Sequence, residues 1–411
     1  MIKELFSLAF YQKKNVRNTC FMAMAAFFTL FGYECVRSTS TVLFKNSFGN
    51  QNLPLVLALT PFVLLPMLYL YSFSLKKFGP QKTLIYSTTL SSIIFILLYQ
   101  LATLELKWPI VLLYLLREGY IVLLIEQYWS FINSSIESQE AKKLNGIVTA
   151  LSGIGGVLGG IFVHAYAKKW GAVPLILVMS GTTLCSLIPA LVAYKNSDVD
   201  VLKKKELPPQ KDGLGLSFIL SERTLLLIML LMIFCQFYSV VVFLNFETAL
   251  QAAYPQTNEQ TSFAGLFYAY VNAGAFVCQL LIAPYLLHRL RPALIHLTLP
   301  LLHLLTFLFI FIHPSIESAA LAFFLFKTTE YSLFRAAKEI LYIPFPDDVR
   351  FRTKEFIDVF CHRTSKSGIS FLISLCSKAG ILVGQSFYLA LIPFALLGWL
   401  ISSLFLCKKS N

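Results

Sequence analysis

Apolar runs of about 20 residues follow one another along the whole chain, and this pattern limits what the chain can fold into. Such a run is as long as an α-helix must be to cross a bilayer. The pattern excludes an outer-membrane barrel, whose strands alternate apolar and polar residues in pieces of about ten. The sequence therefore predicts an all-α membrane protein with about 12 transmembrane helices.

Composition agrees with this fold class. Hydrophobic residues make up 57% of the 411 residues and charged residues 13%, and the mean hydropathy is +0.69. A soluble domain carries roughly twice that share of charge. The first apolar run lacks a small-residue cleavage site and is followed at once by a second run, so we expect no removable signal peptide.

The formal net charge of +13 does not indicate a nucleic-acid partner, because the Lys and Arg residues gather in loops on one side. Roughly 24 of them fall on the side of both termini and about 5 on the other, which predicts cytoplasmic termini. The eight cysteines are scattered through apolar runs without CxxC or Cys/His spacing. We therefore expect no metal site, and no sequence pattern indicates a bound cofactor.

A polar stretch over residues 195–223 divides the chain. Its segment KKKELPPQKDG has the Pro, Gly and charge content of a flexible linker. We expect it to be a cytoplasmic linker between a six-helix bundle over 1–194 and a second over 224–411. The expected spans are about 19–36, 53–75, 83–103, 108–132, 144–166, 172–194, 224–246, 262–287, 293–313, 316–334, 356–381 and 384–407.

A weak internal repeat relates these two halves at an offset of about 212 residues. Leu75–Pro80 lies over Leu287–Pro292, and Glu118 lies over Glu330. Two six-helix halves in parallel repeat, joined by a linker, resemble the layout of the major facilitator fold. That resemblance implies a substrate site near mid-membrane between the halves, with alternating access produced by rocking one half against the other.

Charged residues inside or beside the apolar runs are the candidate functional residues, because a charge in a bilayer costs several kcal/mol. The stretch Lys327–Ser370, the most charged part of the chain, holds half of them. Within it Arg363 and Lys366 are spaced i, i+3 and share a helix face, and Asp358 and His362 are spaced i, i+4 on a neighbouring stripe. The candidate substrate-binding residues are Arg37, Arg117, Glu118, Arg363 and Lys366, and the candidate ion-pair or proton groups are Glu34, Glu126, Lys327, Glu330 and Asp358.

Buried cations suit an anionic substrate, and an Arg fork or a Lys point charge binds phosphate well. In the major facilitator layout Arg37, which closes the first expected span, can face the same space as Arg117 and Lys366. The competing interpretation is structural, with each cation neutralised by a nearby acid. It pairs Arg37 with Glu34, Lys327 with Glu330, and Arg335 with Glu339, and it assigns Glu118 and Glu126 to ion pairs.

The glycine-rich run GIGGVLGG at 153–160 predicts a face where two helices approach closely. It lacks the terminal Lys-Ser/Thr of a phosphate loop and lies inside an apolar span, so it does not indicate a nucleotide-cradling loop.

The block Glu330–Pro344, EYSLFRAAKEILYIP, with KEFIDV at 354–359 and RTSKSG at 363–368, resembles the ADP/ATP translocases, the nucleotide transporter family of obligate intracellular bacteria and plastids. Weaker similarities lie at 258–265 and 129–133. The resemblance implies a nucleotide substrate and a place in a bacterial inner membrane. It also implies Arg37, Glu118 and Lys366 as substrate-site residues.

Two motifs depart from the family. In the seventh expected span the family places an acid followed closely by lysines, and here the corresponding positions read Phe243 and then Glu247. The family's arginine-aspartate-threonine-lysine reads Arg37-Ser-Thr-Ser40 here, so the lysine and the aspartate are missing and specificity stays open.

We expect a transporter of a nucleotide or related phosphorylated metabolite, and no enzyme, since no nucleophile–base set is visible. The alternatives are a proton-coupled facilitator using Glu118 or Glu126, and a non-transporting membrane sensor or scaffold. The expected partners are that small molecule and the lipid bilayer, with no nucleic acid, and a monomer is compatible with the sequence.

Overall fold

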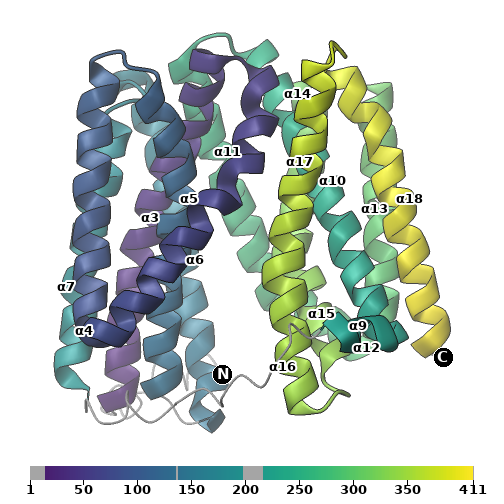
Figure 1. Ribbon diagram of the computed structural model, residues 1–411, viewed down its shortest axis with the longest axis horizontal. Helices are drawn as coiled ribbons and strands as arrows, with labels where there is room; N and C mark the ends of the chain where they lie inside the picture. Colours follow the sequence, from purple (N-terminus) through teal and green to yellow (C-terminus); the bar gives the residue numbers. More distant parts are fainter. Residues whose placement is uncertain (1–13, 136–137, 198–215, 411) are drawn as a thin grey trace. The chain divides into compact units, whose positions relative to one another are not determined.

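The computed structural model describes residues 14–135, 138–197 and 216–410, and every regular element in these ranges is a helix (Figure 1). The predicted all-α fold class is confirmed. The elements are α3 (Lys14–Phe48), η1 (Asn50–Asn52), α4 (Leu53–Thr103), α5 (Trp108–Ser135), α6 (Ser138–Trp170), α7 (Leu175–Asn196), α9 (Leu216–Ser221), α10 (Arg223–Ala253), α11 (Thr257–Val277), η2 (Cys278–Ile282), α12 (Ala283–Arg289), α13 (Pro292–Ile312), α14 (Ile316–Thr329), η3 (Glu330–Phe334), α15 (Arg335–Tyr342), α16 (Asp347–Glu355), η4 (Phe356–Cys361), α17 (His362–Lys378) and α18 (Gln385–Ser410).

Nine helices of the described ranges are long and apolar enough to cross a membrane. One of them, Asn50–Thr103, is 54 residues long and contains two of the expected spans. It breaks at Gly79, whose φ of 77° and ψ of 170° are not helical, and glycine adopts this positive φ without a Cβ penalty. The expected tenth and eleventh spans are helical but carry more charge. The count of twelve spans stays a prediction.

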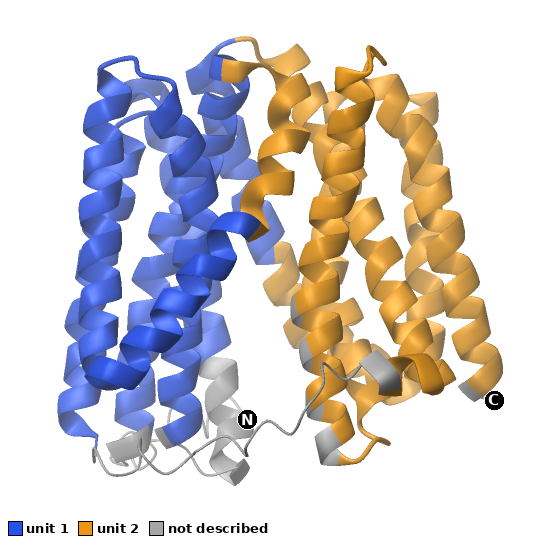
Figure 2. Ribbon diagram, viewed as in Figure 1, with its two compact units in different colours: residues 1–47, 62–210, 256–273 blue, residues 48–61, 211–255, 274–411 orange. Residues whose placement is uncertain are grey.

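Contacts between Cα atoms divide the chain into two compact units (Figure 2). Unit 1 consists of residues 1–47, 62–210 and 256–273, and unit 2 of residues 48–61, 211–255 and 274–411. Helix α11 thus contributes its first part to unit 1 and its end to unit 2. The predicted linker lies mostly at 198–215, outside the described residues, so the predicted halves stay a prediction.

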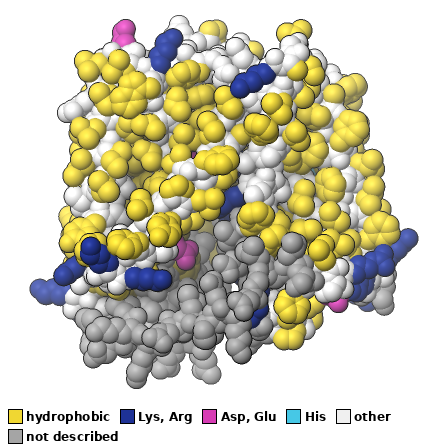
Figure 3. All heavy atoms as spheres, in the orientation of Figure 1, with side chains coloured by type: hydrophobic (Ala, Val, Ile, Leu, Met, Phe, Trp, Pro, Cys, Tyr) yellow, Lys and Arg dark blue, Asp and Glu magenta, His cyan; other side chains and the backbone are white. Residues whose placement is uncertain are grey.

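On the visible face of each unit, hydrophobic side chains cover the middle of the helices (Figure 3). Exposed apolar residues such as Phe62, Tyr69 and Leu382 are 74%, 74% and 94% exposed. In water such a surface would aggregate, whereas it matches a hydrocarbon environment.

The glycine-rich run packs as predicted, within unit 1. A Cβ on Gly155 or Gly159 of α6 would lie 2.3 or 2.4 Å from the carbonyl oxygens of Phe27 and Phe31 on α3. A Cβ on Gly160 would lie 2.5 Å from the carbonyl oxygen of Gly265 on α11. Helix α6 therefore approaches two neighbouring backbones at once, and only glycine allows both contacts.

In unit 2, three π-helical segments interrupt α-helices: η2, η3 and η4. Each shifts the hydrogen-bond pattern from i+4 to i+5, so the side chains after it point in a different direction from a regular helix. Such turns are frequent at functional sites. Both η3 and η4 lie in the stretch that the sequence marks as most charged.

Candidate functional site

Among its described residues, unit 1 holds a cluster of buried and partly buried charges, formed by Glu34 and Arg37 on α3 and by Arg117 and Glu118 on α5. The sequence placed Arg37 at the end of the first span. This was wrong, because α3 continues to Phe48 and Arg37 lies well inside it. The longer helix includes Ser40 and Thr41, which Arg117 contacts together with the backbone carbonyl of Arg37.

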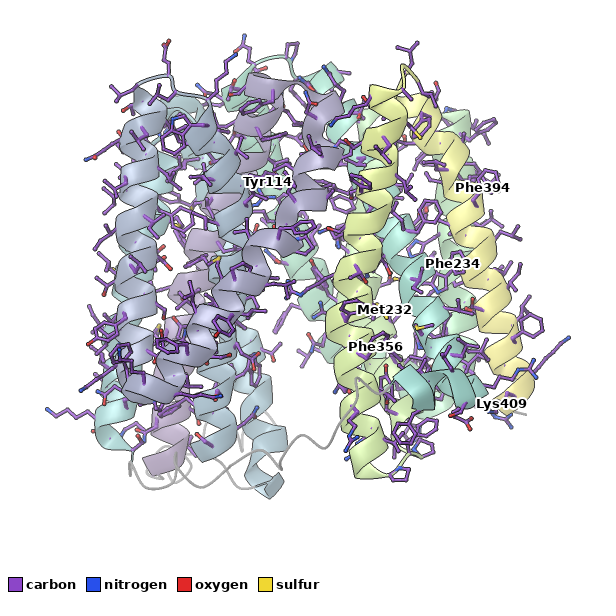
Figure 4. All side chains as sticks on the ribbon, in the orientation of Figure 1. Tyr114, Met232, Phe234, Phe356, Phe394 and Lys409 are labelled. Carbon is purple, nitrogen blue, oxygen red and sulfur yellow. The ribbon has the colours of Figure 1, made fainter. Side chains whose placement is uncertain are left out.

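Arg117 ties α5 to α3. Its Nη1 donates to the carbonyl oxygen of Arg37 at 2.8 Å, to Ser40 Oγ at 2.6 Å and to Thr41 Oγ1 at 2.7 Å. The side chain is 4% exposed, and its guanidinium lies 3.9 Å from the ring centroid of Tyr114, on the same helix (Figure 4). Hydrogen bonds from a charged donor are among the strong ones, so this contact fixes the backbone of α3 around Arg37.

The guanidinium of Arg37 lies 3.7 Å over the ring of Tyr268 on α11, a close cation–π contact. Its expected pairing with Glu34 is present but long, at 3.4 Å between Nη1 and Oε1. The same Oε1 accepts a hydrogen bond of 3.0 Å from Asn272 Nδ2. The other oxygen, Oε2, is buried without a hydrogen-bond partner in the part of the chain that the structure describes.

The two acids of α5, Glu118 and Glu126, differ in their surroundings. Glu118 accepts from Arg117 Nε at 3.3 Å and is 28% exposed, so it takes part in an ion pair as expected. Glu126 is exposed. No ion pair of Glu126 is seen among the described residues, so its predicted pairing stays a prediction.

Unit 2 holds a second cluster, centred on the buried carboxylate of Glu330. Lys327 Nζ lies 2.7 Å from Glu330 Oε2, and Gln236 Nε2 of α10 donates to Oε1 at 2.9 Å. Lys327 also contacts Ser239 Oγ at 3.4 Å. The predicted Lys327–Glu330 pair is confirmed, and both carboxylate oxygens are satisfied, as a charge in the membrane requires.

A further ion pair joins Lys338 of α15 to Asp358 in η4. The sequence placed Asp358 and His362 on one α-helical stripe, and this was wrong because Asp358 lies in a π turn. The predicted Arg335–Glu339 pair was wrong too. Glu339 accepts from Lys354 of α16 at 2.5 Å, whereas Arg335 lies over the ring of Tyr331.

Arg363 and Lys366 both lie partly buried on α17, where the predicted i, i+3 spacing holds because this segment is α-helical. Next to them, Ser367 Oγ donates to the carbonyl oxygen of Ala58 at 2.8 Å. This bond joins α17 to the part of α4 that belongs to unit 2. Arg37 and Arg117 lie in unit 1 and Lys366 in unit 2, so the space they were predicted to share stays a prediction.

Several residues of these clusters were not predicted from the sequence. Tyr268, Asn272 and Gln236 are uncharged, and they reach the clusters only through tertiary packing. Lys45 is fully buried on α3 beyond the expected end of the first span. Its signal was available, since this lysine directly follows the apolar residues Val42–Phe44, about two turns after Arg37.

A family model described as Major Facilitator Superfamily matches residues 22–334. The chain belongs to the Major Facilitator Superfamily. Solved structures with this fold agree, at identities too low to indicate more than the fold. A mutant of the nucleoside transporter NupG has a TM-score of 0.72 at 10% identity, covering 96% of this chain and 100% of that one. A D-xylose–proton symporter has a TM-score of 0.61 at 14% identity, covering 95% and 96%.

Within this superfamily, residues 319–409 match the family model described as TLC ATP/ADP transporter. ADP,ATP carrier protein 1 of Chlamydia muridarum is 23% identical over 70% of this chain and 61% of its own length. A chloroplastic ADP,ATP carrier of Arabidopsis thaliana is 25% identical over 64% of this chain and 47% of its own. The predicted resemblance is confirmed, although the chain spans less than two thirds of the length of these relatives.

Proposed function

We propose that this chain moves a nucleotide, or a related phosphorylated metabolite, across a membrane by alternating access. One observation carries the proposal. The segment that matches the ATP/ADP transporter model, 319–409, is also the segment that carries the cations Lys327, Lys338, Arg363 and Lys366. Lys327 and Lys338 pair with acids. A cation in a bilayer is costly, and an anionic substrate would stabilise the charge of Arg363 and Lys366.

The similarity to carriers named for ADP and ATP supports a nucleotide rather than another anion. In this proposal Arg37, Arg363 and Lys366 contact the substrate, and Glu118 takes part in the site through Arg117. Arg117 itself holds Arg37 in place. Its Nη1 also brings a cation to within 2.6 Å of Ser40 Oγ, at the position where the family motif has a lysine.

The proposal includes the expected topology. Two six-helix halves, 1–194 and 224–411, move against each other, joined by a cytoplasmic linker at 195–223. The excess of Lys and Arg in the loops on one side favours both termini in the cytoplasm. The similarity to carriers of intracellular bacteria supports a bacterial inner membrane.

Purified protein in liposomes tests the proposal. Vesicles loaded with ADP and challenged with labelled ATP should take up the label. This uptake should require nucleotide inside the vesicles or a nucleotide gradient across their membrane. Lys366→Gln should abolish it, while Lys378→Gln, which neutralises an exposed lysine on the same helix, should leave uptake unchanged.

Three results would argue against nucleotide transport. Uptake of another solute driven by a pH gradient and insensitive to nucleotides favours a proton-coupled facilitator. Capture of a protein partner without any flux favours a sensor or scaffold. A folded protein that transports no nucleotide removes the proposal.

A further inference from the structure

The bend of α4 at Gly79, in unit 1, carries three exposed lysines. Lys76, Lys77 and Lys82 lie within seven residues on the two sides of it. No acidic residue occurs between positions 35 and 104, so neither arm of α4 supplies a counter-charge. None of the three lysines forms a salt bridge with a residue that the structure describes. The bend therefore presents three positive charges to its surroundings.

Exposed aromatic rings lie directly beside these charges. Lys77 Nζ lies 5.7 Å from the ring centroid of Phe73 and 5.4 Å from that of Phe78. Across the bend, the ring of Phe78 meets the ring of Tyr86 edge-on, with 5.3 Å between the centroids. All three rings are exposed. Lysines next to aromatic rings are typical of the boundary between the hydrocarbon and the lipid headgroups.

Each arm of α4 also carries a stripe of exposed apolar residues that ends at a lysine. The stripe before the bend has four residues, each at least half exposed: Phe62, Leu65, Tyr69 and Phe73. The stripe after the bend has four residues, each about half exposed: Tyr86, Leu90, Ile93 and Leu97. Steps of three and four residues keep each stripe on one helix face. Lys76 and Lys77 continue the first stripe, and Lys82 precedes the second by one turn.

The bend itself is open. Gly79 has a φ of 77°, and a Cβ added to it would meet nothing within 4 Å. On the face drawn in Figure 3, Lys and Arg side chains gather at the edge of unit 1 over α4, next to a surface of hydrophobic side chains. The protein thus leaves room for a ligand between the lysines.

We propose that the bend of α4 binds the headgroup of an anionic phospholipid, whose acyl chains lie along the two stripes. Charge complementarity selects an anionic headgroup, because each lysine near an anionic surface adds to the attraction. The stripes select a lipid over a soluble phosphate, because they supply apolar surface to its chains. The excess of Lys and Arg on this side of the membrane assigns the lipid to the cytoplasmic leaflet. This inference does not depend on the transported substrate.

Purified full-length protein in dodecyl maltoside micelles tests the inference. Native mass spectrometry measures bound lipid, and thermal unfolding measures stabilisation, after addition of phosphatidylglycerol, phosphatidylcholine or inorganic phosphate. One triple variant, Lys76→Gln with Lys77→Gln and Lys82→Gln, removes the charges, and the corresponding triple Arg variant keeps them. Lys107→Gln is the matched control, because Lys107 is an exposed lysine of the same unit that has an acid, Glu105, two residues before it.

Phosphatidylglycerol should bind more tightly than phosphatidylcholine and raise the melting temperature more. Each lysine near an anionic surface contributes about fivefold in affinity, so the triple Gln variant should bind phosphatidylglycerol roughly a hundredfold more weakly. The triple Arg variant and Lys107→Gln should bind it as the unmodified protein does. If the triple Gln variant fails to fold, Lys77→Gln and Lys82→Gln alone should each show a loss of about fivefold.

Three results would overturn the inference. The first is equal binding of phosphatidylglycerol by the triple Gln variant and the unmodified protein. The second is equal binding and stabilisation by the anionic and the zwitterionic lipid. The third is displacement of phosphatidylglycerol by millimolar inorganic phosphate, because the lysines then take a soluble anion without the help of acyl chains. None of these results bears on nucleotide transport, which the liposome assay measures separately.

Discussion

Removing one member of the buried pair Lys327–Glu330 should destabilise unit 2 far more than removing one member of an exposed pair of similar length. Lys327 Nζ lies 2.7 Å from Glu330 Oε2, and the side chains are 12% and 5% exposed. Lys354 Nζ lies 2.5 Å from Glu339 Oε2, with the side chains 41% and 46% exposed. The two pairs lie in the same unit and have similar N–O distances. They therefore differ mainly in how far their side chains are buried.

Removing one member of a buried pair leaves the other charge unpaired in the membrane. We expect Lys327→Met and Glu330→Gln each to cost about 3–5 kcal/mol of unfolding free energy. The double variant should lose less than the sum of these, since both charges are gone and a glutamine at 330 can still accept from Gln236. Glu339→Gln should cost under about 1 kcal/mol.

Unfolding of the purified variants in mixed detergent and SDS, followed by tryptophan fluorescence, measures these free energies. The double variant separates coupling from independent damage at each position. If Glu330→Gln costs no more than Glu339→Gln, or if the two single losses simply add in the double variant, the reasoning about this buried pair is wrong.

Two smaller predictions concern packing and pH. Gly160→Ala should destabilise unit 1 by about 1–3 kcal/mol, because its Cβ meets backbone atoms, while Gly181→Ala, where nothing lies within 4 Å, should not lower the melting temperature. The hydrogen bond from Lys409, at the end of α18 (Figure 4), lowers the pKa of Glu222. Lys409→Gln should therefore lower the melting temperature slightly at neutral pH. This difference from the unmodified protein should vanish as acidification passes the folded pKa of Glu222.

Much of the fold could be predicted because it depends on local pattern. Runs of apolar residues gave the helices, and the glycine spacing in 153–160 gave a packing face. The pair Lys327–Glu330 was predictable as well, because an i, i+3 spacing brings two side chains together on any α-helix.

The rest depends on tertiary contacts that have no local pattern. Arg117 meets Ser40 and Thr41 because α5 packs on α3, and Asn272 reaches Glu34 from α11. The π turns have no recognised sequence signal either. They change which residues share a face, which is why Asp358 pairs with Lys338.

The most direct test of the account is nucleotide exchange by the purified protein in liposomes. Vesicles loaded with ADP should take up labelled ATP, and the uptake should be lost in Lys366→Gln while that variant still inserts and melts as the unmodified protein does. Nucleotide uptake that is absent from a folded protein, or that is equal in Lys366→Gln and the unmodified protein, would contradict it.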